Sequence, residues 1–356
     1  MARDAARSRC RQQLELLADS ALDVDALRLE AIDQLRKTIG FELWGCPLVD
    51  PDTLIPSRVV VSNLPPWGAN LPQRWVLDQS VGEINSRVTL ARGPRHVGVL
   101  SAATEGDLAR CRRWREMGQA AGMGDELRAA IVDESGCWGS FELFRAAGDP
   151  PFDTGDAELM RHAGRILARP LRQGRLGGTE EHTVHPDQTG VVLIGDDLRL
   201  QGVTPAARAW SALLGARQKP ERTPLPLPVY GVVGRLLAAE ASEDPERPPR
   251  VRVRASDGRW ALIEAARLDG TANTIAVSIR AASTDEILAL ACRAYGLTAR
   301  ERELVALVLE GLDTSELATR MFISAYTVKD HLKSVFSKLG VHSRRQLVTG
   351  LFGQTA

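Results

Sequence analysis

The stretch that decides the fold of the C-terminal part is Leu297–Phe352, LTARERELVALVLEGLDTSELATRMFISAYTVKDHLKSVFSKLGVHSRRQLVTGLF. Its apolar residues recur at helical spacing, and no strand pattern interrupts them. Thr298-Ala-Arg-Glu301 and Asp313-Thr-Ser-Glu316 are capping boxes, each marking a helix start. Gly311 stands where a helix ends in a left-handed conformation. The sequence therefore predicts four helices, over about 299–310, 314–321, 324–339 and 344–351.

The third of these helices has two chemically different faces. One face is an apolar stripe of Val328, Leu332, Val335, Phe336 and Leu339, which we expect to pack on the first two helices against Leu304, Leu307, Val308, Leu317, Met321 and Ile323. The other face carries Lys329, Asp330, Lys333, Ser334, Ser337 and Lys338. Two helices followed by a short turn and a helix with exposed basic residues form a helix-turn-helix, whose second helix fits the DNA major groove.

These residues resemble a known family closely. The match lies in Leu297-Thr-x-Arg-Glu301, Glu303, Gly311-Leu312, Glu316-Leu-Ala318, Ile323-Ser324, Thr327-Val-Lys329, His331, Lys338-Leu-Gly-Val341 and Ser343-Arg344. In spacing and residue type they are similar to the LuxR/NarL/GerE helix-turn-helix domain of bacterial transcription regulators. The resemblance implies a DNA-binding transcriptional regulator that is not an enzyme and has no catalytic residues.

The resemblance also implies which residues meet DNA. Lys329, Asp330 and Lys333 occupy positions where the family's recognition helix meets bases and phosphates. Tyr326, Thr327 and Lys338 occupy positions where contacts with the DNA backbone are common. Three interpretations of Asp330 stay open: it accepts from a cytosine amino group, it excludes other bases, or it pairs with Lys333.

The last predicted helix, Arg344 to Leu351, resembles the family's dimerisation helix. By position, the resemblance implies Leu347, Val348 and Leu351 as contacts in a homodimer. The alternative is that some of these side chains complete the core of a single chain.

The sequence upstream predicts an α+β domain over residues 1–175. A helical pattern runs from about Ser8 to Thr38, and Arg58–Ser62 and His96–Ser101 have the pattern of short strands. Residues 126–132 and 137–144 predict a hairpin about the turn at 133–136, and 152–171 a closing helix. A further helix is expected at about 107–117. The order of these elements resembles a GAF domain.

A polar, glycine-rich segment at 176–189 is expected to be a linker. After it, residues 190–282 predict strand, turn, strand, two helices and a three-strand finish with Asp257-Gly258 as a hairpin turn. This order resembles a PAS-like domain, so we expect three domains with the all-α helix-turn-helix domain at 290–356. The layout also resembles an actinobacterial class of LuxR-type regulators with GAF-like and PAS-like regions.

The composition is ordinary for a globular chain and conceals an uneven charge. Its 356 residues carry 45 basic and 45 acidic side chains. From Ala291 onward, however, nine basic residues stand against six acidic ones. Three of the five lysines lie on one predicted helix, at 329, 333 and 338. We expect DNA as the partner of this segment.

Other patterns exclude or weaken several function classes. The five cysteines are far apart and form no C-x-x-C pair, which is typical of reduced thiols rather than of a disulfide framework or zinc site. No apolar run is long enough to span a membrane, and no signal-peptide core follows the N-terminus. No P-loop, G-x-S-x-G or H-E-x-x-H motif occurs. We therefore expect a cytoplasmic protein, associated with the nucleoid when bound to DNA, without a metal or cofactor.

Four minor patterns have a structural and a functional interpretation. Asp196-Asp197 fits a turn better than a phospho-receiver, and His182-Thr-Val-His185 lacks a third metal ligand. The run Arg110-Cys-Arg-Arg-Trp-Arg115 fits a solvated helix face better than an anion site. The seven tryptophans all precede the predicted DNA-binding domain and fit core packing better than a ligand pocket.

The function predicted from sequence is sequence-specific binding of double-stranded DNA by a homodimer. Its GAF-like and PAS-like region would sense a signal or mediate dimerisation, with a small-molecule ligand in the GAF-like domain and RNA polymerase left open as partners. The sequence names neither the ligand nor its binding residues. The alternative is a signalling or interaction module, either an enzyme or a ligand-free dimerisation scaffold, with the C-terminal helices as a docking element.

Overall fold

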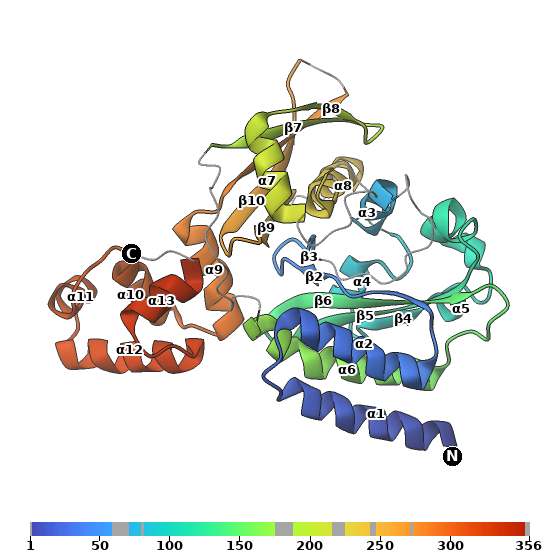
Figure 1. Cartoon of the computed structure of the whole chain (residues 1–356), viewed down its shortest axis with the longest axis horizontal. Coiled ribbons are helices and arrows are strands. Elements are labelled where there is room, and N and C mark those ends of the chain that lie inside the picture. Colours follow the sequence, from blue (N-terminus) through green and yellow to red (C-terminus); the bar gives the residue numbers. More distant parts are fainter. Residues whose placement is uncertain are drawn as a thin grey trace. The chain divides into compact units, whose positions relative to one another are not determined.

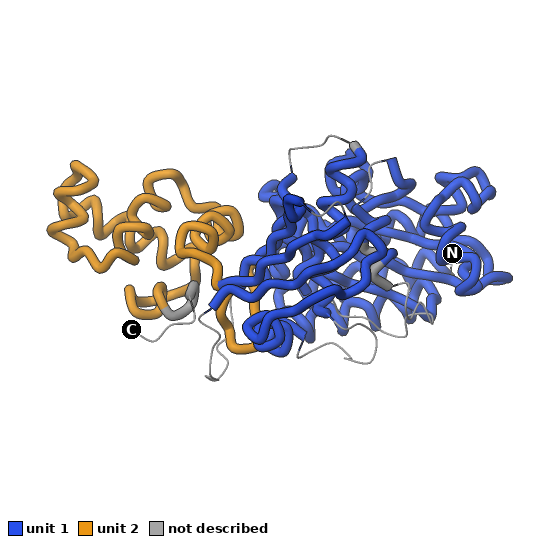
Figure 2. Tube along the Cα trace, turned by 90° about the horizontal axis from the view of Figure 1, so that it is seen from above, with its two compact units in different colours: residues 1–171, 185–253, 261–280 blue, residues 172–184, 254–260, 281–356 orange. Residues whose placement is uncertain are grey.

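The computed structural model describes residues 2–58, 71–79, 82–174, 188–215, 225–242, 247–270 and 273–352. The chain divides into two compact units (Figure 2). The first unit holds residues 1–171, 185–253 and 261–280, and the second holds 172–184, 254–260 and 281–356. No helix in the described ranges is long and apolar enough to cross a membrane.

The first unit contains an antiparallel sheet of six strands. In sheet order five of them are β3 (Pro56–Arg58), β2 (Leu48–Val49), β6 (Gly136–Ala146), β5 (Met123–Asp133) and β4 (Val97–Val99), and β1 (Leu43–Gly45) pairs with β6. The predicted hairpin is confirmed as β5 and β6, with Leu127 opposite Leu143. Its turn is held by Asp133, whose Oδ1 accepts hydrogen bonds from the Ser135 amide and the Trp138 indole.

Helices cover both faces of this sheet (Figure 1). Three of them lie on one face: α1 (Ala2–Ala18), α2 (Val24–Ile39) and α6 (Thr154–Gly174). The closest approach is at Gly164 of α6, where an added Cβ would lie 2.6 Å from the Ala130 carbonyl oxygen of β5. On the opposite face lies α4 (Arg87–Arg92), next to α3 (Leu71–Gln79) in the chain, while α5 (Leu100–Ala103) follows β4 directly.

Two expectations for this region need correction, and a third lies almost entirely outside the described residues. The single helix expected from Ser8 to Thr38 is two helices, because Asp23 caps the second one by accepting from the Asp25 and Ala26 amides. The helix expected at about 107–117 is a 3-10 turn at Leu108–Arg110 and a π-helical turn at Trp114–Gly118. Of the strand expected at 58–62, only Arg58 lies within the described residues, where it ends β3.

A second sheet of five strands belongs to the same unit. Its order is β8 (Leu200–Val203), β7 (Gly190–Gly195), β11 (Thr274–Ala281), β10 (Trp260–Arg267) and β9 (Arg250–Arg254). The helices α7 (Pro205–Gly215) and α8 (Leu227–Ser242) accompany it. The expected turns at 196–197 and 257–258 are confirmed. In the first, the Arg199 amide donates a hydrogen bond to the Asp197 carboxylate, and in the second, Gly258 has a left-handed backbone at φ +83°.

The two sheets are joined by a buried ion pair. Both Nε and Nη2 of Arg252 on β9 donate to the Asp50 carboxylate at 2.8 Å. Arg252 and Asp50 are both buried, and Asp50 also accepts from the Arg252 amide. Burial by itself lowers the pKa of Arg252, but the Asp50 and Asp52 carboxylates raise it well above its usual value. An N-terminal α/β region with two sheets is thus confirmed, while the predicted domain boundaries stay predictions.

The polar face of the β5–β6 hairpin is buried by a group of charged residues that we call the buried ionic cluster. Its members are Asp78, Glu83, Arg87, Arg113, Glu126, Arg128 and Glu142, all less than one-tenth exposed. The Nε and Nη1 atoms of Arg128 lie 2.7 Å and 2.9 Å from Glu126 and Asp78. Arg87 lies 2.8 Å from Glu142. Alternate positions on β5 and β6, which could have faced water, therefore face opposite charges.

The arginine run at 110–115 does not form a single surface. Arg113 is buried in the ionic cluster, where its Nη2 lies 2.5 Å from Glu126. Arg112 pairs with Glu116 at 2.5 Å, and Arg115 donates to the Ala109 carbonyl. The expectation of a solvated helix face is therefore wrong for Arg113, and no common anion site is formed by the run.

The cysteines and tryptophans of the first unit are mainly core residues. All five cysteines are free. Burial raises the pKa of the Cys46 thiol to about 12 and those of Cys111 and Cys137 to about 11, so these thiols stay protonated at neutral pH. Four tryptophans are buried: Trp44, Trp138, Trp210 and Trp260. Trp67 and the side chain of Trp75 lie outside the described residues.

Candidate nucleic-acid interface

The second unit contains five helices within its described residues. They are α9 (Thr284–Tyr295), α10 (Ala299–Leu309), α11 (Thr314–Met321), α12 (Ala325–Leu339) and α13 (Arg344–Phe352). Both predicted capping boxes are present at α10 and α11, and Gly340 ends α12 in the left-handed conformation. The four predicted helices are therefore confirmed to within about one residue.

Sequence reasoning missed α9, although the signal was present. Ser283 and Glu286 form a third capping box of the same type, and Gly296 closes the helix at φ +63°. Three apolar side chains of α9 are buried at helical spacing: Ile287, Leu290 and Ala294. Its C-terminal residue Tyr295 donates a hydroxyl hydrogen bond to the Gln173 carbonyl within the same unit.

The predicted core positions α12 against α10 and α11. Val328, Leu332 and Val335 are all buried, whereas Phe336 and Leu339 are partly exposed. Their predicted partners are buried as well, namely Leu304, Leu307, Val308, Leu317 and Met321, while Ile323 is half-buried. One face of α12 is therefore fixed by apolar packing, and the opposite face is left for a partner.

The outward face of α12 presents the predicted base-reading residues. Lys329, Asp330 and Lys333 are all exposed. Neither lysine forms an ion pair with any described residue. The interpretation that Asp330 pairs with Lys333 is therefore not supported by a contact in the structure. A hollow of about 650 Å³ beside the two lysines is lined on its inner side by Leu332 and Phe336. Two unneutralised cations one helical turn apart suit a polyanionic partner.

The N-terminus of α12 has polar and aromatic neighbours. Ser324 caps it by accepting from the Thr327 amide, and the two hydroxyls lie 2.9 Å apart. Tyr326 is 74% exposed. Helix starts attract phosphate, but contact of Tyr326 and Thr327 with the DNA backbone stays a prediction, and the Thr327 amide already donates to Ser324.

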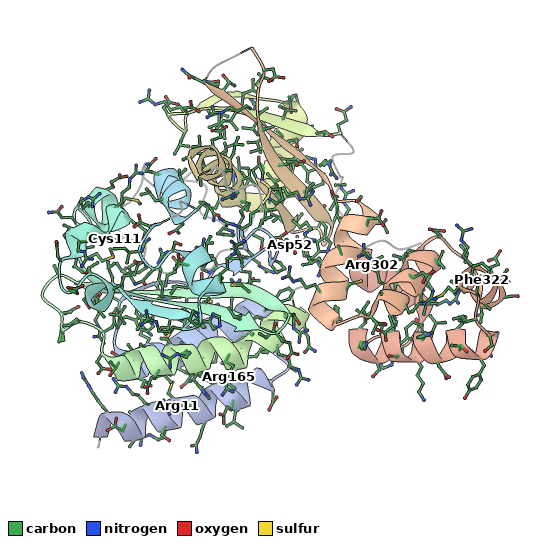
Figure 3. All side chains as sticks on the ribbon, turned by 180° about the vertical axis from the view of Figure 1, so that it is seen from behind. Arg11, Asp52, Cys111, Arg165, Arg302 and Phe322 are labelled. Atoms are coloured by element: carbon green, nitrogen blue, oxygen red, sulfur yellow. The ribbon has the colours of Figure 1, made fainter. Side chains whose placement is uncertain are left out.

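Sequence reasoning also missed Phe322, in the turn between α11 and α12. This side chain is 94% exposed and its backbone is left-handed at φ +57° (Figure 3). A phenylalanine in that conformation is strained by about 1 kcal/mol relative to glycine. The sequence analysis assigned Phe322 neither to the core nor to the DNA-facing surface, because an apolar residue just after a helix has no local signal of exposure.

Lys338 lies in a different environment from the other two lysines. Its Nζ lies 2.6 Å from the Glu301 carboxylate and 3.2 Å from the Gly296 carbonyl. Glu301 is 3% exposed and also accepts from the Ser334 hydroxyl at 2.7 Å. The capping carboxylate of α10 thus holds the C-terminal half of α12. Contact of Lys338 with the DNA backbone stays a prediction. In the structure this lysine is already paired with Glu301.

The Glu301 pair makes the second unit sensitive to acid. Burial raises the pKa of Glu301, but Lys338 and the Thr298 amide lower it more strongly, to about 2. The unfolded chain has a Glu pKa of about 4.3, so the pair's contribution is fully present above that pH and is lost as pH falls toward 2. We expect the free energy of unfolding to fall by at most about 2 kcal/mol, because solvent screening at the partly exposed Lys338 reduces the effect.

This expectation can be tested by unfolding the full chain at pH values from about 6 to 3. The wild type should lose stability more steeply with acid than Glu301→Gln. Glu303→Gln, which removes an exposed carboxylate paired with Arg300, is the matched control and should follow the wild type. Parallel profiles for wild type and Glu301→Gln would contradict the assignment.

The predicted dimerisation residues occupy three different environments on α13. Leu347 is fully buried within the unit, as the alternative interpretation of a monomer core requires. Val348 is half-buried, and the side chain of Leu351 lies outside the described residues. Dimerisation through this helix stays a prediction. Of the three predicted contact residues, Val348 is the one whose side chain is described and partly exposed.

The predicted absence of a metal site was argued from sequence and remains an expectation. Within the described residues, no group of three or more His, Cys, Asp or Glu side chains is placed to hold a metal ion. His182 and His185 lie outside those residues.

Comparison with known proteins identifies the same segment. The family described as "Bacterial regulatory proteins, luxR family" matches residues 296–350. Spore germination protein GerE of Bacillus subtilis is 44% identical over 55 residues, which are 15% of this chain and 74% of GerE. The activator DevR/DosR of Mycobacterium tuberculosis is 43% identical over 51 residues, 14% of this chain and 24% of that protein.

A Mycobacterium bovis protein named as HTH-type transcriptional regulator Mb0914c is 46% identical over 79 residues. These are 19% of this chain but only 9% of that relative's length. Among solved structures, Escherichia coli SdiA covers 96% of both chains, with 11% identity and a TM-score of 0.34, a likeness too weak to assign a fold. The similarity that can be interpreted is therefore confined to the second unit.

Proposed function

We propose that this chain, which belongs to the luxR family of bacterial regulatory proteins through residues 296–350, reads DNA sequence with α12 in the major groove. It is a DNA-binding transcriptional regulator, and the observation that carries the groove assignment is the outward face of α12. There Lys329 and Lys333 are exposed and unneutralised, with Asp330 between them. Lysines donate to guanine edges or phosphates, and a carboxylate accepts from cytosine.

The N-terminal region is proposed to regulate this reader by sensing a signal or by mediating dimerisation in the cytoplasm. An antiparallel sheet with helices on both faces, followed by a five-stranded sheet with two helices, supports the GAF-like and PAS-like interpretation. The buried Arg252–Asp50 pair connects these two modules, so they would respond as one body. A homodimer would bind an operator with two-fold symmetry.

Selection from a random duplex library with the full chain tests the proposal. We expect enrichment of one short motif, repeated about a two-fold axis, with an affinity that falls steeply as salt rises. Selection by the Lys329→Ala/Lys333→Ala variant is the control and should lose the motif. Recovery of unenriched sequence by the wild type would contradict sequence-specific reading. An unrepeated motif would leave specific reading intact but exclude the dimer.

A further inference from the structure

A cavity of about 670 Å³ opens in the first unit, where α1 and α6 lie alongside the end of the β5–β6 hairpin. Its lining includes Arg11 of α1 and Arg161, His162 and Arg165 of α6. Figure 3 shows Arg11 and Arg165 on these two adjacent helices. Ala130 and Val132 of β5 form its apolar floor.

From this cavity we infer that the first unit binds a small organic oxyanion, a phosphorylated or carboxylated metabolite, between α1 and α6. The inference rests on the proposed sensing role and names the ligand class for it. Guanidinium groups recognise both phosphate and carboxylate through paired N–H donors, so either chemistry fits the three arginines.

The three arginines of the cavity are not neutralised by ion pairs with described residues, a condition they share with Arg169 and Arg208. Arg11, Arg161 and Arg165 form no ion pair with a described residue; Arg161 donates only to the Arg95 carbonyl, at 3.3 Å. By contrast, Arg36 and Arg112 on other exposed helix faces both pair with a carboxylate one turn away. Asp133, Glu134 and Glu158 also line the cavity, so we expect the oxyanion on its arginine side, between α1 and α6.

Two buried nitrogen atoms also lack an acceptor. Both Arg11 Nε and His162 Nε2 are inaccessible to solvent and have no hydrogen-bond partner. His162 Nε2 lies 3.4 Å from Glu15 Oε1, which is ion-pair distance when the imidazole is protonated but not hydrogen-bond geometry. A bound oxyanion would accept a hydrogen bond from Arg11 Nε, and one from His162 Nε2 when that nitrogen carries a proton.

The cavity is also distinguishable from an ordinary solvated helix face. The lining residues of α6, Glu158, Arg161, His162 and Arg165, follow helical spacing and point to one side. Arg169 continues that row by one further turn but does not line the cavity. The chain thus provides a control that has the same charge, the same helix and the same exposure but lies outside the site.

Binding is tested by calorimetry and thermal unfolding of the full chain with inorganic phosphate and with citrate, against chloride at equal ionic strength. We expect saturable binding of at least one of the two anions. Arg161→Gln/Arg165→Gln should raise Kd on the order of tenfold for each arginine removed, while Arg169→Gln should leave Kd unchanged. An absence of saturable binding, or equal effects of all three substitutions, would overturn the inference.

His162 gives a second, site-specific measurement. Burial lowers its pKa, Arg165 and Arg11 lower it further, and Glu15 raises it. Other charged or titratable groups at the cavity are Glu158, Arg161, His96, Asp133 and Glu134. A bound anion adds negative charge beside the imidazole, so its NMR titration should move to higher pH with phosphate or citrate. The shift should be absent from Arg161→Gln/Arg165→Gln.

The same preparations separate this inference from the proposed function. Operator binding by the double variant without anion should match the wild type, because the substitutions lie outside the second unit. Absence of saturable anion binding by the wild type, with its operator binding retained, would refute only the cavity assignment. Loss of operator binding by the wild type itself would refute the proposed function.

Discussion

Replacing Arg128 by methionine is expected to lower the free energy of unfolding of the first unit by about 3–5 kcal/mol. Arg128 is 2% exposed and lies between Glu126 and Asp78, at 2.7 Å and 2.9 Å. Burial lowers its pKa, but these carboxylates raise it well above the usual value, so the side chain is always charged. The substitution would remove the cation closest to Asp78 and leave Glu126 paired with Arg113, so two buried carboxylates would be only partly neutralised.

Urea unfolding of the full chain, followed by tryptophan fluorescence, measures this effect, because six of the seven tryptophans belong to the first unit. Arg112→Met is the matched control: it removes the same group from an exposed pair with Glu116, and we expect a loss of no more than about 0.5 kcal/mol. Comparable losses for the two variants would show that the buried ionic cluster contributes no more than a surface pair does.

Replacing Lys333 by alanine is expected to weaken operator binding by about 1–3 kcal/mol if its ammonium group contacts a base. The side chain is exposed on the outward face of α12, one turn after Lys329, and has no partner within the described residues. A phosphate contact would give a smaller and sequence-independent loss. In that case the slope of log K against log salt would fall by about one.

Fluorescence anisotropy with the selected operator and a shuffled duplex distinguishes these two outcomes. Lys37→Ala removes the same charge from α2, where the lysine pairs with Asp33, and should leave DNA affinity unchanged. Unchanged affinity of Lys333→Ala at matched salt would remove this residue from the interface.

The helices of the second unit could be predicted from sequence because their signals are local. Thr298–Glu301, Asp313–Glu316 and Gly340 each act within one helical turn, and the structure confirms all three. The same rule applied at Ser283 would have found α9. Local patterns were weaker in the first unit, where Asp23 divides a continuous helical periodicity into two helices.

Charge pairing over long separations could not be predicted from sequence. Three lysines on one helix looked equivalent, yet Lys338 is bound to Glu301, 37 positions away, while Lys329 and Lys333 remain exposed. Polar residues alternating with apolar ones on β5 were compatible with a solvated face. Their burial depends on Asp78 and Arg87, which the fold brings from other elements.

The sequence by itself thus determined the helix-turn-helix and which face of α12 is turned outward, because helical period and capping are properties of neighbouring residues. Only the tertiary structure decided which charges are neutralised, because ion pairing depends on distance in space. It placed Arg128 against two carboxylates and brought Arg11 and Arg165, 154 positions apart in the sequence, to one cavity. The helix-turn-helix of this protein therefore follows from local sequence, whereas the cavity between α1 and α6 follows from the tertiary fold.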